Sequence, residues 1–86
     1  MVLTANDELI VSDTGNHSIR VLTPQGAVRT LCGNGKAGFA DGKVADARFN
    51  EPRGLALDPK GNLLVADFGN DAIRLVTMEG SVSTGT

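Results

Sequence analysis

Leu63-Leu64-Val65-Ala66-Asp67 is a short apolar run that ends in an acidic residue, and Leu9-Ile10-Val11-Ser12-Asp13 precedes it by 54 positions with the same pattern. The correspondence holds without a gap between residues 2–30 and 56–84, and 12 of these 29 pairs are identical. Self-similarity at a fixed spacing is the signature of a repeat architecture. The chain is therefore built from two copies of one structural unit.

Each copy divides into four short apolar runs separated by Gly, Asn, Asp and Pro. Such separators supply the positive or preset φ angles of tight turns, and four strands joined in this way form an antiparallel meander, the blade of a β-propeller. The sequence thus predicts an all-β protein of two four-stranded antiparallel β-meander blades. The expected boundaries are 1–32 for blade 1, 33–53 for a connector with one short helical turn near 44–49, and 54–86 for blade 2.

Composition excludes several classes of protein. The 86 residues carry a net charge of −2 with scattered Lys and Arg, which is not the basic surface of a nucleic-acid-binding protein. No apolar stretch reaches the length of a membrane span, and the N-terminus lacks the pattern of a secretory signal. We expect a soluble protein of unknown compartment, cytoplasmic by default. One cysteine excludes an internal disulfide.

The strand Leu63–Ala66 is apolar throughout, which predicts burial of both its faces. Two blades alone would leave one apolar face bare at each end, and because the two faces differ, the contact that covers them is head-to-tail. Such contacts close into a ring when the rotation permits. We expect completion of the propeller by oligomerisation, with a homotrimer first and a tetramer next.

The residues resemble the NHL repeat family. The resemblance rests on 61–67, Gly69-Asn70, Ile73-Arg74 and 80–82 in the second copy, on 11–20 in the first, and on the glycine-rich connector. It implies a β-propeller, most often of six blades, that binds proteins, RNA or other ligands. A minority of similar propellers are lyases or hydrolases with metal ions at the central channel.

Two groups of residues are predicted to have structural roles. Polar and glycine residues recur at the turn after the second strand of each copy, where they suit tight hairpins: Asp13, Gly15, Asn16, Asp67, Gly69 and Asn70. Packing between blades is expected of Phe49, Pro52, Arg20 and Arg74. The arginines are expected to bind a connector carbonyl or an acidic partner, for which the sequence leaves both Asp41 and Asp46 open.

The connector is the candidate binding loop, through Asn34, Lys36, Phe39 and Asp41. Its Gly33-x-Gly35-x-x-Gly38 spacing opens no helix, so a dinucleotide site is not expected. His17 is interpreted as a solvated turn residue and Cys32 as a small buried side chain. We predict no catalytic residue, cofactor or metal ligand.

The leading hypothesis is a non-catalytic scaffold that associates with itself and holds a protein or small ligand on its loops, without nucleic-acid or membrane partners. Two alternatives stay open. The chain could be a fragment of a metal-containing propeller enzyme, or an engineered propeller fragment with no function beyond assembly, an idea prompted by its start and stop near blade boundaries.

Overall fold

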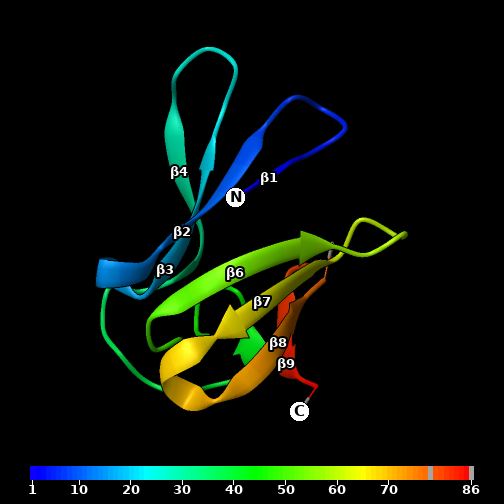
Figure 1. The fold of residues 1–86 in the computed structure, drawn as a ribbon. Helices are drawn as coiled ribbons and strands as arrows, with labels where there is room; N and C mark the ends of the chain where they lie inside the picture. The colour runs from blue at the N-terminus through cyan, green and yellow to red at the C-terminus, as the bar shows by residue number, and fades with distance from the viewer. Residues whose placement is uncertain (78, 86) are drawn as a thin grey trace.

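The structure is a computed structural model that describes residues 1–77 and 79–85. It consists of two antiparallel sheets, one for each copy of the repeat (Figure 1). The strands are β1 (Val2–Leu3), β2 (Leu9–Asp13), β3 (Ser18–Leu22), β4 (Val28–Gly33), β5 (Gly42–Lys43), β6 (Pro52–Leu57), β7 (Leu63–Asp67), β8 (Ala72–Val76) and β9 (Ser81–Thr84). The prediction of an all-β protein made of two antiparallel meanders is confirmed.

Blade 1 has the strand order β1-β2-β3-β4, in which each strand pairs with its neighbour in the chain. Its register places Val11 opposite Arg20 and Leu9 opposite Leu22. A one-turn 3-10 helix, η1 (Thr14–Asn16), joins β2 to β3. It ends at His17, whose left-handed φ of 52° turns the chain into β3.

Blade 2 has the order β5-β9-β8-β7-β6, so it carries five strands where the sequence predicts four. The additional strand β5 belongs to the connector, and it pairs antiparallel with β9 through Gly42 opposite Val82 and Lys43 opposite Ser81. Strand β5 forms here because β9 would otherwise be the edge strand of blade 2, and its unpaired backbone N–H and C=O groups need hydrogen-bond partners. A second 3-10 helix, η2 (Phe68–Asn70), repeats η1.

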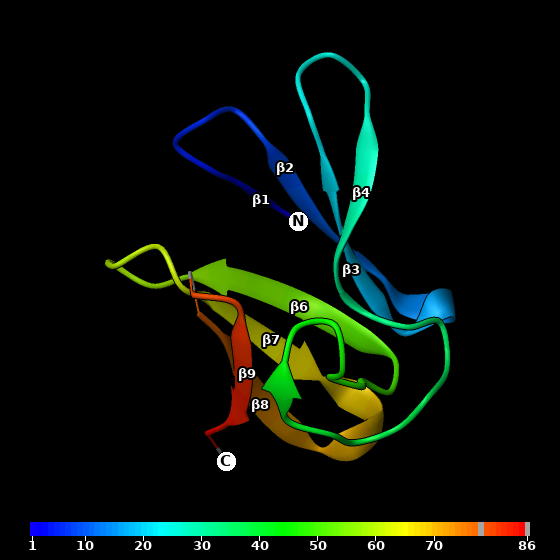
Figure 2. The ribbon, with the colours of Figure 1, turned by 180° about the vertical axis from the view of Figure 1, so that it is seen from behind.

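Where one short helical turn is predicted, the connector forms a single turn that does not continue into a helix. The N–H groups of Asp46 and Ala47 both donate to the carbonyl of Lys43 at 2.9 Å, which closes a single turn. Arg48 then pairs with Ala40 in an isolated antiparallel bridge, because the two arms of the connector run back along each other. Figure 2 shows this green segment leaving β4, lying against β9 and returning to β6.

The two blades share one hydrophobic core, although they splay apart at the ends of their hairpins (Figure 1). Strand β2 of blade 1 and strand β6 of blade 2 contact each other directly. Both blades and the connector contribute buried side chains: Ile10, Ile19, Val21, Cys32, Ala47, Phe49, Leu63, Val65, Val76 and Val82. Burial raises the pKa of the Cys32 thiol to about 12, so this thiol stays neutral.

Hydrogen bonds between the blades lie near the start of β6, where the register shifts between Pro52 and Leu55. The hydroxyl of Ser12 donates to the carbonyl of Arg53 at 2.6 Å, and that of Thr14 donates to the carbonyl of Pro52 at 2.7 Å. The irregular pairing leaves these carbonyls available as acceptors. In the described ranges, no helix is long and apolar enough to cross a membrane.

Candidate functional site

A buried ion pair between Asp67 and Arg74 forms the centre of blade 2. Asp67 ends β7, and Arg74 lies in β8 opposite Val65, which places both side chains on the same face of the sheet. Arg74 Nη1 lies 2.7 Å from Asp67 Oδ2, and both side chains have no exposed surface. A buried charge pair of this kind is retained only where every polar atom finds a partner.

The connector supplies the remaining partners of Arg74. The Arg74 guanidinium donates hydrogen bonds to the carbonyl of Arg48 at 2.9 Å and to the carbonyl of Ala40 at 2.8 Å. Its Nη2 also lies 2.8 Å from Asp41 Oδ1. The rings of Phe39 and Phe49 both have their centroids 4.8 Å from the guanidinium carbon. The connector thus wraps Arg74 with two carbonyls, one carboxylate and two aromatic rings.

Asp67 fixes the turn η2 and the start of β6. It accepts hydrogen bonds from Asn70 Nδ2 at 2.7 Å and from the backbone N–H of Asn50 at 2.8 Å. Asn70 also donates to the carbonyl of Gly38. A methyl group at Gly69 would lie 2.5 Å from Asn50 Cγ and 2.7 Å from its backbone oxygen, so the close approach at this turn requires glycine.

Blade 1 repeats these residues without the connector. Arg20 Nε lies 3.0 Å from Asp13 Oδ2, and Asn16 donates to the same carboxylate at 3.0 Å. Arg20 also donates to the hydroxyl of Thr30. The side chains of Arg20 and Asp13 are 29% and 34% exposed. A methyl group at Gly15 would meet no atom within 4 Å.

The exposed pair in blade 1 lies on what we call the open face of blade 1, formed by Val11, Asp13, Arg20, Leu22 and Val28. With Ser12, these residues line a surface depression of about 280 Å³. Hydrogen bonds from Asn16 and then Arg20 hold the pKa of Asp13 below its usual value. The open face is therefore apolar with one accessible ion pair.

Several residues make contacts in the structure that differ from those predicted from the sequence. Arg20 contacts its own blade, so its described partners do not include the connector. Phe39 and Asp41, expected in a binding loop, both contact Arg74 and also remain accessible, since Phe39 is 57% exposed and the Asp41 side chain is 45% exposed. Asp41 further accepts a hydrogen bond from the Thr84 hydroxyl. Asp46 has no described contact with either arginine side chain.

The other predicted residues lie as follows. Phe49 and Pro52 are fully buried beside the blade junction. Asn34 and Lys36 stay exposed in the connector, where the Asn34 side chain accepts a hydrogen bond from the Lys36 N–H. Among the described residues, no group of three or more His, Cys, Asp or Glu side chains could hold a metal ion.

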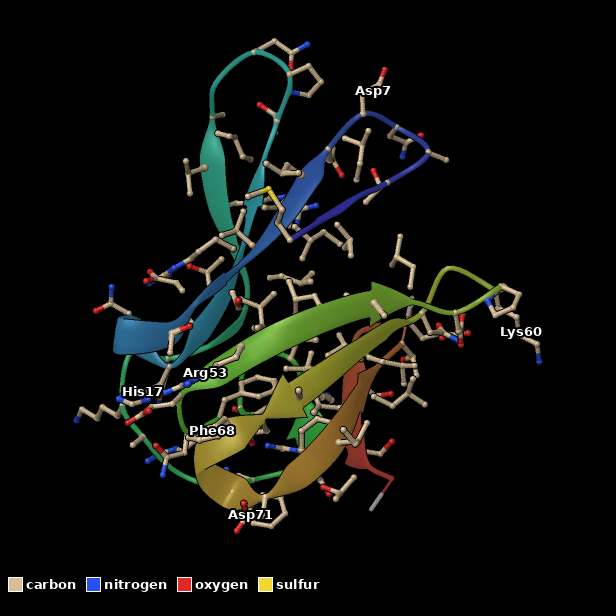
Figure 3. All side chains as sticks on the ribbon, in the orientation of Figure 1. Asp7, His17, Arg53, Lys60, Phe68 and Asp71 are labelled. Atoms are coloured by element: carbon tan, nitrogen blue, oxygen red, sulfur yellow. The ribbon has the colours of Figure 1, made fainter. Side chains whose placement is uncertain are left out.

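Sequence reasoning missed the role of His17. Its side chain is only partly exposed, and its Nδ1 accepts a hydrogen bond from the backbone N–H of Glu51 at 3.0 Å. His17 therefore joins blade 1 to the start of β6. Figure 3 shows it beside Arg53, whose guanidinium carbon lies 3.9 Å from the centroid of the Phe68 ring. No signal in the sequence identifies this contact, because one residue lies in blade 1 and the other in the connector, 34 positions apart.

The two meanders, their shared core and the repeated Asp–Arg pair define the class of protein: a pair of consecutive β-propeller blades. Residues 49–74 match the family model of the NHL repeat. This match confirms the resemblance seen in the sequence, and the chain contains an NHL repeat.

Known relatives agree with this assignment. The chain is 48% identical over 79 residues to the Protein SUPPRESSOR OF QUENCHING 1, chloroplastic, of Arabidopsis thaliana, covering 90% of this chain and 8% of that protein. It is 35% identical to NHL repeat-containing protein 2 of Gallus gallus, covering 93% of this chain and 11% of that protein. The chain thus spans about a tenth of the length of these relatives.

A solved structure has the same arrangement of strands. A structural genomics protein of unknown function from Bacteroides thetaiotaomicron matches with a TM-score of 0.84 and 30% sequence identity. The match covers 91% of this chain and 20% of that chain. The arrangement of the two blades is therefore found within a longer protein.

Proposed function

We propose that the chain is a non-catalytic binding scaffold that associates head-to-tail with further copies of itself, so that its blades form part of a closed propeller. The surfaces that would meet are the open face of blade 1 and the outer face of blade 2, which consists of Leu64, Ala66, Ile73 and Leu75. Membership of a repeat family whose blades stack on one another supports this proposal.

The observation that carries the proposal is a difference in burial between equivalent residues. Ile10 and Ile19 of blade 1 are 7% and 0% exposed where they pack toward blade 2. Their counterparts in blade 2, Leu64 and Ile73, are 37% and 42% exposed. When an apolar face is buried in one copy of a repeat and exposed in the next, the exposed face is suited to pack against a following blade.

The open face of blade 1 has the complementary property. Val76 and Val82 of blade 2 are buried against the connector and blade 1, whereas their counterparts Leu22 and Val28 are exposed. The outer face of blade 2 is equivalent to the face of blade 1 that packs against blade 2. The outer face of blade 2 in one copy can therefore pack against the open face of blade 1 in another copy. Three copies would bring about six blades together, and four copies about eight.

A native mass measurement tests this proposal. The chain has a mass of 8.9 kDa, so we expect a closed trimer of roughly 27 kDa at micromolar concentration. The Ile73→Lys variant should be monomeric, because association would bury the charge of the new lysine without a partner. Gln25→Lys adds the same charge in an exposed turn and should leave the trimer intact. A wild-type chain that stays monomeric at this concentration would overturn the proposal.

Once such a scaffold forms, the loops at its rim would carry the ligand. Of the four residues of the expected binding loop, Asn34 and Lys36 are exposed without contacting Arg74. A protein or small ligand could therefore reach them. Alanine at both positions should weaken binding of such a ligand without changing the native mass.

A further inference from the structure

A cleft of about 460 Å³ separates the two blades at the end of the molecule where their hairpins splay apart (Figure 1). Three buried side chains line it, namely Ile10 of β2, Leu63 of β7 and Val76 of β8. Leu31 and Leu57 add partly buried apolar surface from the two blades. A concave and mostly apolar space of this size is typical of sites that bind small molecules.

Two side chains of opposite charge, Glu8 and Arg29, line the same cleft. Arg29 lies opposite Val21, which lies opposite Ile10, so Arg29 is on the face of blade 1 that contains these buried residues. Arg29 Nη2 lies 3.6 Å from Glu8 Oε1, which is too far for a hydrogen bond. Within residues 1–77 and 79–85, neither side chain has another polar partner. Both groups therefore keep their capacity to bind a ligand.

The charges of Glu8 and Arg29 are not part of the repeat pattern. At the spacing of 54 residues their counterparts are Asn62 and Ser83, whereas the structural Asp–Arg pair recurs in both blades. Packing of a blade thus does not require these charges. The Glu8 backbone is nevertheless fixed, because its N–H donates to Thr4 Oγ1 at 3.2 Å and its carbonyl accepts from the Thr4 N–H at 2.8 Å.

We propose that the cleft binds a free α-amino acid with a large aliphatic side chain. The ligand carboxylate would bind the Arg29 guanidinium, and the ligand ammonium group would bind the Glu8 carboxylate. The ligand side chain would lie between Leu31, Leu57 and Val76 and bury apolar surface there. An α-amino acid carries both charges on groups attached to one carbon, which matches a cation and an anion that lie side by side.

Charge complementarity favours a zwitterion over other apolar ligands. An apolar acid without an amine would draw Arg29 away from Glu8 and leave the Glu8 carboxylate without a cation. An apolar amine would leave Arg29 without an anion for the same reason. A zwitterion provides a partner for each of the two side chains.

The cleft is separate from the faces that would meet in self-association. It lies between the two blades of one chain, and its lining includes none of the residues of the open face of blade 1 or of the outer face of blade 2. Amino-acid binding is therefore expected for the single chain and for the ring alike.

Titration of the full wild-type chain with L-leucine, followed by ¹³C methyl NMR, tests the site. We expect saturable shift changes at the methyl groups of Ile10, Leu63 and Val76, with a Kd below about 1 mM. Three matched compounds each lack one recognised group: 4-methylpentanoate lacks the ammonium group, 3-methylbutylamine lacks the carboxylate, and glycine lacks the side chain. Each should bind at least about tenfold more weakly than L-leucine.

Variants of the chain assign the two charged contacts. Glu8→Gln and Arg29→Gln should each weaken L-leucine binding at least about tenfold, while both chains stay folded because an exposed pair contributes little to stability. Arg53→Gln is the matched control: the Arg53 side chain is also 54% exposed, it pairs with Glu51 at 3.3 Å, and it does not line the cleft. This variant should bind L-leucine as the wild type does.

Three results would overturn the inference. These are no saturable shift change in the cleft with L-leucine, binding of 4-methylpentanoate as tight as that of L-leucine, and unchanged L-leucine binding by Glu8→Gln and Arg29→Gln. The native mass is measured separately, so failure of the self-association proposal would be distinguished from failure of this site.

Discussion

Blade 1 and blade 2 contain the same aspartate, asparagine, arginine and threonine at equivalent positions, yet only blade 2 buries its aspartate and arginine. In blade 2 the Asp67–Arg74 pair is fully enclosed, whereas the Asp13–Arg20 pair of blade 1 remains accessible. The difference comes from the connector, which brings Asp41, two carbonyls and Phe49 to Arg74. Each repeat therefore contains an Asp–Arg pair that can bind a connector. The pair belongs to the buried core only where the connector covers it.

The largest expected difference between the blades is in the stability cost of losing the arginine. Arg74→Met leaves the Asp67 carboxylate buried without its charge partner and frees the connector carbonyls, so it should lower the free energy of unfolding by about 3–5 kcal/mol. Arg20→Met removes a partly exposed pair and should cost less than about 1 kcal/mol. Urea unfolding followed by circular dichroism measures both values.

The matched variants carry the same chemical change, so differences in side-chain volume or charge do not affect the comparison. Equal costs for Arg74→Met and Arg20→Met would show that the connector does not alter the energetics of the pair, contrary to the account given above.

A smaller difference is expected at the two equivalent turn glycines. Gly69→Ala forces a methyl group against the backbone of Asn50, and such overpacking should cost about 1–3 kcal/mol. Gly15→Ala adds a methyl group in open space and should change stability by no more than about 0.5 kcal/mol. Thermal unfolding of the two variants distinguishes them, and a cost at Gly15 equal to that at Gly69 would argue against the close approach of Asn50.

The smallest effect concerns the titration of Asp13. Hydrogen bonds from Asn16 and Arg20 lower its pKa from 3.8, so its contribution to stability is present above that pH and is lost as the pH falls through the lower folded value. The ¹³C shift of the carboxyl group should report a midpoint below 3.8. Asn16→Ala should raise this midpoint by removing the largest cause, and an unchanged midpoint would contradict the assignment.

The sequence predicted the blades because their signals are local. Each strand is a short run such as Leu63–Ala66, and the turns at Gly69 and Asn70 follow it directly. The repeat of the same signals in residues 2–30 made the pairing order clear. Local patterns of this kind are sufficient for a meander, since each strand pairs with the next.

The connector could not be predicted in the same way. Gly42 and Lys43 form β5 only because the edge of β9 lies beside them, and nothing apolar or alternating marks them as a strand. The choice between Asp41 and Asp46 as the partner of Arg74 depends on how 21 connector residues fold back, which no spacing reveals. The hydrogen bond from the Glu51 N–H to His17 likewise joins the connector to a residue of blade 1 far away in the sequence.

Hydrogen exchange of the two arginine side chains tests most directly whether the connector sets the difference between the blades. The Nε–H group of each arginine can be followed by NMR in the Ile73→Lys chain, where self-association does not contribute. We predict that Arg74 Nε–H, enclosed by Asp41 and the connector carbonyls, exchanges much more slowly than Arg20 Nε–H, although both donate to a carboxylate. Equal exchange rates at the two arginines would contradict this account.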